Sequence, residues 1–347
     1  MNRSRSLGLM AGLALTALAL TGCSQAAPAE PATDTPATET DTLAPATLNL
    51  YTSEPQEKID EIVAAFNVHQ PEVTVEVFRA GTGDLTARIA AEEKAGEIGA
   101  DLLLAADSGT FEGYVERDLL REYLPAEADK LDQNVLDPEG FYTGTRIIPT
   151  VIAYNTNEIT APPKSWADLT KPEYSGKLVM PNPDVSGAAA FNAAVWLNEP
   201  ALGEGWLTDL AKNQPLIADS NGPVSQAVAD GSQPVGIVVD YLVRDLAAAG
   251  SPIAVSYPTE GVPYVAQPVG IFANTEAPEA AEAFVDFLVS EEGQKLAVEQ
   301  AYLPVRGDVG TPKGAPELSS ITMLNPDLDA IRAAQPASVE TFKKLFQ

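Results

Sequence analysis

The stretch LVMPNPDVSGAAAFNAAVWL, residues 178–197, contains a short apolar strand, a turn and a helix in direct succession. The strand is Leu178–Met180, and a Pro-containing turn separates it from Ser186 and a run of small residues. The start of a helix favours anions because its backbone N–H groups lack partners and the helix dipole is positive there. The small residues Gly187 and Ala188 allow a ligand to approach the backbone. The stretch predicts an α/β unit in which Ser186 either opens an anion site or only caps the helix.

The composition excludes several classes of function. The chain has 347 residues, enough for two domains, and a formal net charge of −28, which repels nucleic acid. It contains one histidine and one cysteine. An intramolecular disulfide and a His- or Cys-based zinc site are therefore excluded, and a Ser-His-Asp triad has little to rest on. We expect neither enzymatic activity nor a cofactor, and we expect His69 to lie at the end of a helix.

The amino terminus predicts export and a lipid anchor. Arg3 and Arg5 precede an apolar stretch that ends in Leu-Thr-Gly-Cys at Cys23. This stretch is too short to span a membrane and reads as a signal peptide, residues 1–23. The Leu-Thr-Gly-Cys motif resembles the lipobox of bacterial lipoproteins, in which the cysteine is acylated. The alternative is a plain secretory signal with an incidental Cys23. Residues 24–46 contain mainly Ala, Pro, Thr and acidic residues, so we expect a disordered tether.

The body begins with alternating strands and helices. Expected strands end near residues 51, 78 and 104, and each is followed by a loop and a helix with apolar residues on one stripe. This alternation predicts a mostly parallel sheet covered by helices. Ligands bind at the carboxyl ends of such strands, so the loops at 51–54, 81–84 and 107–108 are expected on one rim.

Two long extended segments, one near 147–154 and one near 253–272, flank a second block of strands and helices. They predict two α/β lobes with mixed sheets, joined by a pair of hinge strands. We expect residues 47–148 and 267–347 to form lobe 1, and residues 149–266 to form lobe 2.

From residue 48 on, the chain resembles the two-lobed periplasmic solute-binding proteins of bacterial ABC importers. The resemblance rests on LNLYTSE at 48–54, FRAGTGDLTARI at 78–89, VIAYNTNEI at 151–159, the segment 165–191, VDYLVRDLAAAGSPIAVSYPTEG at 239–261 and the segment 277–309. The segments are similar to the branch that binds ferric iron, phosphonates or sugar phosphates. The resemblance implies the type II periplasmic-binding-protein fold, with the ligand held between the two lobes.

The ligand that this resemblance implies is either iron or an organophosphorus anion. Iron-binding members hold Fe(III) with adjacent tyrosines, but here Asp240 precedes Tyr241. The positions of the family's histidine and glutamate correspond to Ser53-Glu54 and Ala106-Asp107, respectively. An iron site of Glu54, Asp107, Asp240 and Tyr241 is chemically conceivable, because oxygen ligands suit the cation, but it is not the pattern of the family.

The anion alternative uses other residues of the same cleft. Ser186, Gly187 and Ala188, with Thr52 or Ser53 across the cleft, would hold a phosphonate or phosphate. Two carboxylates, Asp240 and Glu260, would receive an amine, and two tyrosines, Tyr154 and Tyr241, would line the pocket. These groups suit a zwitterion such as 2-aminoethylphosphonate. Two simpler interpretations remain, in which Asp240 caps the following helix and Tyr154 belongs to the core.

The resemblance also implies partners. We expect a monomer, exported and held at the membrane by its lipid, that delivers a small solute to the permease subunits of an ABC importer. A second hypothesis is a sensor, in which the same lobes signal to a membrane receptor.

Overall fold

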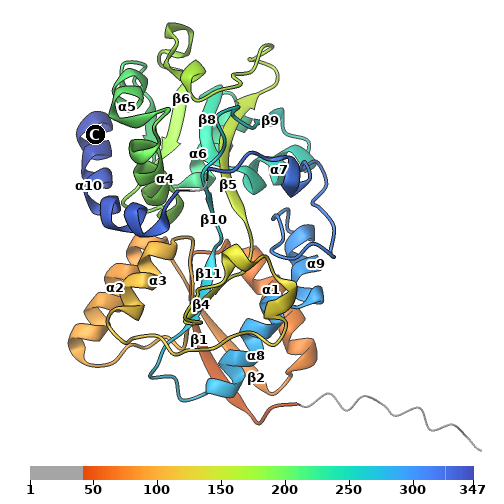
Figure 1. Ribbon diagram of the computed structural model, residues 1–347. Coiled ribbons are helices and arrows are strands. Elements are labelled where there is room, and N and C mark those ends of the chain that lie inside the picture. The colour runs from red at the N-terminus through yellow and green to blue at the C-terminus, as the bar shows by residue number, and fades with distance from the viewer. Residues whose placement is uncertain (1–41, 325) are drawn as a thin grey trace, which may run out of the picture. The chain divides into compact units, whose positions relative to one another are not determined.

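The computed structural model describes residues 42–324 and 326–347. The expected signal peptide with Cys23, and the expected tether as far as residue 41, lie outside the described residues. Figure 1 shows two α/β lobes, each built around its own sheet.

Five strands form the first sheet in the order β2-β1-β3-β11-β4. Its strands are β1 (Ala46–Thr52), β2 (Val73–Arg79), β3 (Leu102–Leu104), β4 (Tyr142–Gly144) and β11 (Pro268–Ile271). The first three are parallel, as the strand–helix alternation predicts, and β11 is antiparallel to both β3 and β4. The helices of this lobe are α1 (Gln56–His69), α2 (Thr82–Ala95), α3 (Ser108–Val115), α8 (Pro278–Val289) and α9 (Glu291–Glu299). His69 is the last residue of α1, as expected.

The second sheet has the order β10-β5-β8-β6-β7, and β9 also pairs with β5. Its strands are β5 (Ile148–Asn155), β6 (Leu178–Pro181), β7 (Leu216–Ala218), β8 (Val235–Val239), β9 (Ile253–Ser256) and β10 (Tyr264–Val265). The helices around it are α4 (Gly187–Asn198), α5 (Gly203–Ala211), α6 (Asn221–Ala229), α7 (Asp240–Ala248) and α10 (Leu328–Phe346). Short 3-10 turns occupy Ala128–Lys130, Gln133–Val135, Ala167–Thr170, Pro172–Tyr174 and Leu318–Ser320.

The chain passes between the two sheets along neighbouring segments. It leaves the first sheet after β4 and enters the second at β5, and it returns from β10 to β11. These crossings are hydrogen-bonded to each other, because the backbone N–H of Thr145 donates to the carbonyls of Ala266 and Gln267. They are the two hinge strands of the predicted fold.

The carboxyl-terminal helix lies on a different lobe from the one expected. The sequence assigned all of 267–347 to lobe 1, but α10 packs against α4 and α5 beside the second sheet (Figure 1). The physical reason is its apolar face, on which Ile331 and Phe342 join the cores around α4 and α5. With α10 on one side and the sheet on the other, α4 is enclosed, which explains why that helix is apolar on every face.

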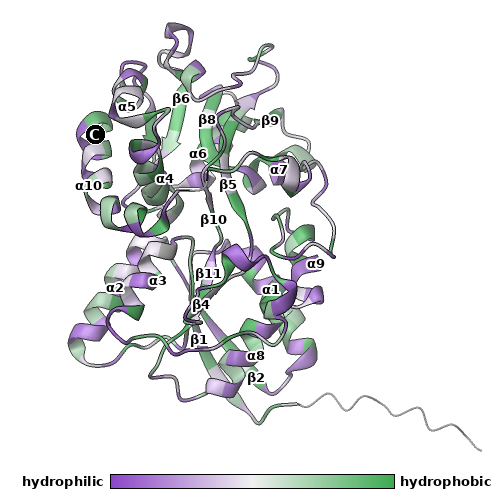
Figure 2. Cartoon of the chain, in the orientation of Figure 1, coloured by the Kyte–Doolittle hydropathy of each residue, from purple (hydrophilic) through white to green (hydrophobic). Residues whose placement is uncertain are grey.

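The second lobe is built around a cluster of tryptophans. Trp166, Trp196 and Trp206 pack pairwise with ring centroids 5.5–6.1 Å apart, and all three are buried. The indole N–H of Trp166 donates to Gly261 O at 2.8 Å, and that of Trp206 donates to Trp166 O at 2.9 Å. In Figure 2 the neighbouring strands β5, β6 and β8 are hydrophobic along much of their length. The cluster therefore fixes α4 and α5 to the second sheet.

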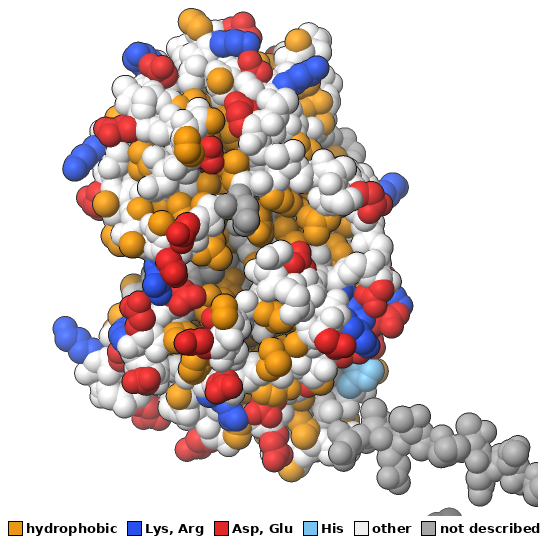
Figure 3. All heavy atoms as spheres, in the orientation of Figure 1, with side chains coloured by type: hydrophobic (Ala, Val, Ile, Leu, Met, Phe, Trp, Pro, Cys, Tyr) orange, Lys and Arg blue, Asp and Glu red, His pale blue; other side chains and the backbone are white. Residues whose placement is uncertain are grey.

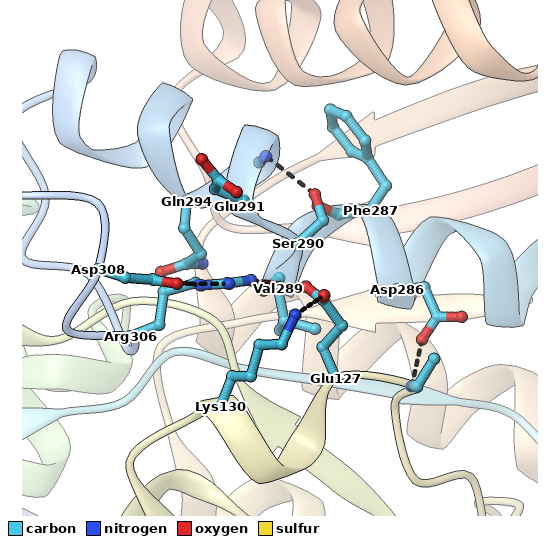
Figure 4. A network of polar contacts seen from close by, with 12 residues as sticks. Glu127, Lys130, Asp286, Phe287, Val289, Ser290, Glu291, Gln294, Arg306 and Asp308 are labelled. Atoms are coloured by element: carbon cyan, nitrogen blue, oxygen red, sulfur yellow. Dashed lines mark hydrogen bonds and ion pairs between the residues drawn. The ribbon is translucent and has the colours of Figure 1, made fainter.

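A buried guanidinium connects distant segments of the first lobe. Arg306 donates to both oxygens of Asp308, at 2.7 and 2.8 Å, and to Glu127 at 2.6 Å (Figure 4). Lys130 also pairs with Glu127. These charge-assisted bonds fix the turn after α9 to the loop before β4.

Acidic side chains are spread over the face in Figure 3, and Lys and Arg side chains lie mostly beside them. Within the described part of the chain, no helix has the length and apolarity needed to cross a membrane.

Candidate functional site

A cavity of 410 Å³ lies between the two lobes, at the carboxyl ends of strands from both sheets. Residues on its wall include Ser53, Glu54, Arg79, Gly81, Thr82, Ser186, Gly187, Ala188, Ser220, Asn221, Gly222, Tyr241 and Gln267. Carboxyl ends of parallel strands and starts of helices meet at the same edge of an α/β sheet, so both lobes present helix starts here.

The starts of five helices line this cavity. Pro55 precedes α1 and Gly81 precedes α2 in the first lobe, and α4, α6 and α7 begin at the cavity in the second. Each start contributes backbone N–H groups and the positive end of a helix dipole. The cavity therefore favours a ligand with negative charge.

At the start of α4, the side chain of Ser186 accepts a hydrogen bond from only one of the free backbone N–H groups of the helix. The Ser186 hydroxyl accepts from the backbone N–H of Ala189 at 3.2 Å and from Asn221 Nδ2 at 2.9 Å. Among the described residues, the backbone N–H groups of Gly187 and Ala188 have no acceptor. Ser186 is thus an N-cap, and the two N–H groups that follow it remain available to a ligand.

The charged side chains on the wall leave one cation in excess. Arg79, at the end of β2, is exposed and donates from Nε to the backbone carbonyl of Glu54 at 3.2 Å. No carboxylate of the described residues forms an ion pair with it. Glu54, the one carboxylate that the described residues place on the wall, lies 3.2 Å from Arg146 Nη1 and accepts hydrogen bonds from Tyr302 and Gln267. Because Arg146 balances Glu54, the positive charge of Arg79 remains uncompensated.

Two tyrosine rings pack against each other beside Glu54, with their planes tilted by 41°. The rings of Tyr241 and Tyr302 have centroids 4.2 Å apart, and Lys58 Nζ lies 5.5 and 5.2 Å from them. Burial, together with the nearby charge of Glu54, raises the pKa of both phenols above its usual value. Both tyrosines are therefore neutral near pH 7 and offer hydroxyl groups, not phenolates.

Six of the residues expected from the sequence come together on this wall: Ser53, Glu54, Ser186, Gly187, Ala188 and Tyr241. Thr52 lies directly behind it. Its hydroxyl donates to Leu104 O at 2.9 Å and accepts from the backbone N–H of Glu54 at 3.0 Å. Thr52 therefore positions Glu54 and does not itself line the cavity.

Two of the other expected residues are engaged in the second lobe. Asp240 is fully buried and accepts from Arg244 at 2.6 Å and from Tyr257 at 3.1 Å. Burial raises its pKa, although Arg244 acts in the opposite direction. Glu260 accepts from the backbone N–H groups of Trp166 and Ala167 and so caps a 3-10 turn.

Tyr154 and Asp107 also lie off the cavity wall. Tyr154, near the end of β5, packs against the tryptophan cluster. Asp107 caps α3 by accepting from Gly109 N, and its other oxygen accepts from Gln335 of α10. Burial raises its pKa. It lines a separate cavity of 430 Å³ between α2, α3 and α10.

The four residues of the conceivable iron site are therefore dispersed. Glu54 and Tyr241 line the cavity, whereas Asp107 and Asp240 serve as an N-cap and a buried ion-pair partner. Among the described residues, no three His, Cys, Asp or Glu side chains gather in a group that could hold a metal ion.

The residues of the wall that the sequence did not predict include Arg79, Asn221, Gly222 and Gln267. Arg79 ends β2 and could have been found, because the adjacent loop was already expected on the rim. The Ser-Asn-Gly sequence at the start of α6 is a helix-start signal of the same kind as Ser186. For Gln267, no local signal exists, since it lies in a hinge strand.

A cavity that opens between two α/β lobes, at helix starts from both, defines a two-lobed solute-binding protein. The profile of the bacterial extracellular solute-binding proteins matches residues 98–334. The chain therefore belongs to this family, which serves ABC transporters and binds solutes without catalysing a reaction.

Curated relatives agree with this assignment at low identity. A probable ABC transporter periplasmic-binding protein, y4fP, of Sinorhizobium fredii is 29% identical over 224 residues, 61% of this chain and 62% of the relative. The spermidine/putrescine-binding periplasmic protein of Escherichia coli is 25% identical over 233 residues, 63% of this chain and 64% of the relative. The chain thus spans somewhat less than two thirds of each of these two proteins.

Solved structures share the fold over nearly their whole length. The periplasmic binding protein AfuA from Actinobacillus pleuropneumoniae, with fructose-6-phosphate bound, has a TM-score of 0.79 and 22% identity, and the match covers 87% of this chain and 98% of AfuA. Iron-bound HitA from Pseudomonas aeruginosa has a TM-score of 0.76 and 22% identity, with 87% and 100% covered. At this identity the two structures support the two-lobed fold and leave the ligand open.

Proposed function

We propose that this protein captures a small phosphorylated or phosphonate solute between its lobes and delivers it to the permease subunits of an ABC importer. The observation that carries the proposal is the convergence of five helix starts and the unpaired Arg79 on one cavity. Within the described ranges, Glu54 is the one carboxylate that faces this cavity, and it is neutralised by Arg146. An anion enters such a site with favourable charge and with donors already oriented toward it.

The phosphoryl group is proposed to lie at the starts of α4 and α6. The backbone N–H groups of Gly187 and Ala188 have no acceptor among the described residues, and Asn221 and Gly222 begin the neighbouring helix. Ser53 and Arg79 face them from the first lobe. Donors from both lobes would contact one ligand, so binding would hold the lobes together.

A phosphate ester without an amine suits these residues better than 2-aminoethylphosphonate. Asp240 and Glu260 are the two carboxylates that the sequence suggested for an amine. Asp240 instead accepts a hydrogen bond from Arg244, and Glu260 accepts one from the backbone N–H of Trp166. Of the carboxylates in the described part of the chain, an ammonium group in the cavity would find only Glu54, whose charge Arg146 already balances. The fructose-6-phosphate named for the AfuA structure belongs to the class that we favour.

Ferric iron is the second candidate, favoured by the adjacent rings of Tyr241 and Tyr302 and by the fold shared with iron-bound HitA. A tyrosinate site requires that both phenols lose their protons. Here burial and Glu54 raise the pKa of both. A trivalent cation would also meet Arg79 and Arg146 close to the same cavity, which makes iron the weaker proposal.

Calorimetric titration of the purified protein tests the ligand class. The panel contains hexose phosphates, 2-aminoethylphosphonate, inorganic phosphate and ferric citrate. For the organophosphorus compound that binds best, we expect Arg79→Gln to raise Kd at least tenfold. A hydrogen bond to a charged group contributes about 1.5–3 kcal/mol, and about 1.4 kcal/mol corresponds to a factor of ten.

The matched control is Lys212→Gln, which removes the same charge from an exposed side chain at the end of α5 and should leave Kd unchanged. Binding of ferric citrate with a red colour, and of no organophosphorus compound, would overturn the anion proposal in favour of iron.

The lipid anchor at Cys23 and the transport role remain parts of this proposal. Acylation of Cys23 predicts that the protein sediments with membranes and that Cys23→Ala releases it. Transport predicts that the solute-loaded protein stimulates the ATPase of its importer. Stimulation of a membrane receptor without any importer would favour the alternative sensor role.

A further inference from the structure

The starts of α2 and α4 meet across the ligand cavity. α2 begins at Thr82 in the first lobe and α4 begins at Gly187 in the second, and both residues line the cavity. The backbone N–H of Gly83 donates to the carbonyl of Val185 at 3.3 Å, so the two lobes are hydrogen-bonded at this point. Each helix start carries a positive partial charge. Two such ends repel each other, and an anion placed between them would relieve the repulsion.

The side chain of Thr82 lies directly against the first residue of α4. A Cβ at Gly187 would be 2.9 Å from Thr82 Oγ1, so no side chain separates this hydroxyl from the helix start. The backbone N–H groups of Gly187 and Ala188 have no acceptor among the described residues. Hydrogen-bond donors from the two lobes are therefore neighbours here.

The Thr82 hydroxyl itself is almost buried and unused. The residue is only 4% exposed, and its hydroxyl forms no hydrogen bond within the described part of the chain. The buried side-chain atoms without a partner include Tyr114 Oη and Gln335 Oε1 but not Thr82 Oγ1, which keeps accessible surface. Buried polar groups nearly always have a partner, so an unused hydroxyl calls for an explanation.

The position of Thr82 favours a ligand as that partner. Thr82 and Gly187 border both the ligand cavity and the neighbouring cavity of 430 Å³, so they form the partition between the two. Ala188, which offers the second free N–H group, lines the ligand cavity and not its neighbour. The donors that surround the Thr82 hydroxyl therefore belong to the ligand cavity.

We propose that the Thr82 hydroxyl donates a hydrogen bond to the same phosphoryl group that the N–H groups of Gly187 and Ala188 bind. This inference rests on the proposed function. A threonine hydroxyl donates one hydrogen bond, and a charged phosphoryl oxygen is a strong acceptor. The phosphoryl group then bridges the starts of α2 and α4, which belong to different lobes. Thr82 therefore couples recognition of the phosphoryl group to closure of the lobes.

Substitutions of Thr82 test this role with the organophosphorus compound that binds best. Thr82→Val keeps the branched shape of the side chain and replaces the hydroxyl with a methyl group. We expect it to raise the calorimetric Kd at least about tenfold, the usual effect of losing a hydrogen bond to a charged group. Thr82→Ala should do the same, whereas Thr82→Ser retains the hydroxyl and should bind within about threefold of the wild type.

Two further measurements distinguish a bridging hydroxyl from a structural one. Because the hydroxyl bonds no described residue, the Tm of Thr82→Val without ligand should not fall. Stopped-flow kinetics should show that the rise in Kd comes from faster dissociation, because the bridge forms only after the lobes have closed.

Thr86→Val is the matched control. Thr86 lies one turn further along α2 and does not line the ligand cavity. Its hydroxyl donates to Gly83 O at 2.8 Å, so the loss of this bond should lower the Tm and leave Kd unchanged. The same pattern in Thr82→Val would mean that the Thr82 hydroxyl has a structural role only.

The outcomes separate the inference from the function on which it rests. If the compound binds Thr82→Val as tightly as the wild type, or binds Thr82→Ser as weakly as Thr82→Val, the inference is wrong and the proposed function stands. A higher Kd with an unchanged dissociation rate would also overturn the bridge between the lobes. If no organophosphorus compound binds the wild type, the proposed function itself fails. The Ala and Ser variants keep the test decisive even if Thr82→Val does not fold.

Discussion

Lys58 of α1 and Asp245 of α7 form an ion pair of 2.9 Å that connects the two lobes. The same ammonium group donates to Gln300 O at 2.7 Å and lies over the rings of Tyr241 and Tyr302. The pair thus lies directly behind the tyrosines at the cavity. Because it can form only when the lobes approach each other, it should favour the closed arrangement over the open one.

We predict that Lys58→Met weakens ligand binding by a few fold. Partly exposed ion pairs contribute about 0–1 kcal/mol, and a cation over an aromatic ring adds a similar amount. Calorimetric Kd values for the best phosphoryl ligand measure the effect. Lys295→Met is the control, since Lys295 pairs with Glu291 on the same helix and does not connect the lobes. Equal affinity for wild type and Lys58→Met would show that the pair has no part in closure.

We predict that Gly187→Ala impairs binding without unfolding the protein. A Cβ at Gly187, in the second lobe, would lie 2.9 Å from Ala106 O and from Thr82 Oγ1 of the first lobe. An added methyl group would therefore hold the lobes apart, and we expect Kd to rise at least about tenfold, the equivalent of about 1.4 kcal/mol. The Tm without ligand should hardly change.

Gly205→Ala is the matched control for Gly187→Ala. A Cβ at Gly205, in α5, would meet no atom within 4 Å. Alanine in a helix is favoured over glycine by about 1 kcal/mol, so this variant should raise Tm and keep Kd. Wild-type affinity in Gly187→Ala would contradict the close approach of the lobes.

We predict that Trp166→Ala destabilises the second lobe by about 3–5 kcal/mol, the usual range for removing a buried tryptophan. Trp166 is fully buried and contacts both other tryptophans of the chain. Urea unfolding followed by circular dichroism measures the change in the free energy of unfolding. Leu124→Ala, at a side chain that is 59% exposed, should cost far less. Similar losses in the two variants would mean that the cluster does not stabilise the lobe.

The Arg306–Asp308 pair predicts a specific acid sensitivity. Hydrogen bonds from Arg306 lower the pKa of Asp308 to about 2, below the value of about 3.9 for an unfolded aspartate. The contribution of the pair to stability is therefore complete above about pH 4 and is lost as the pH falls through about 2. Asp308→Asn should flatten the dependence of Tm on pH in this window. If the Tm of Asp308→Asn falls at low pH as steeply as that of the wild type, the acid sensitivity comes from other carboxylates, such as Glu127.

Local patterns predicted much of the fold and part of the site. The alternation of strands and helices after residue 48 predicted the parallel β1, β2 and β3, and their carboxyl ends do lie on one rim. Ser186 caps α4 as one interpretation of its sequence required. These features depend on periodicity, capping and turn residues within a few positions of the chain, so the sequence alone contains them.

The partners of the charged side chains could not be predicted from the sequence with the same certainty. Asp240 follows a strand, where ligand residues occur, but Arg244 lies one helical turn later and neutralises it. Asp240 and Arg244 are both visible in the sequence. Whether Asp240 contacts a ligand or forms an internal ion pair depends on its burial in the folded protein. Glu260 is a similar case, since the turn that it caps lies 93 and 94 positions earlier in the chain.

The sequence by itself determined the two α/β lobes, the strand ends where a ligand would bind and the helix start at Ser186. Only the tertiary structure decided which side chains reach the cavity. In the folded chain, Arg79 and Gln267 line the cavity, Asp240 is buried in the core, and α10 packs against the second lobe. The physical reason is that periodicity and capping act within a turn or a strand, whereas burial and charge pairing depend on residues that are distant in the chain.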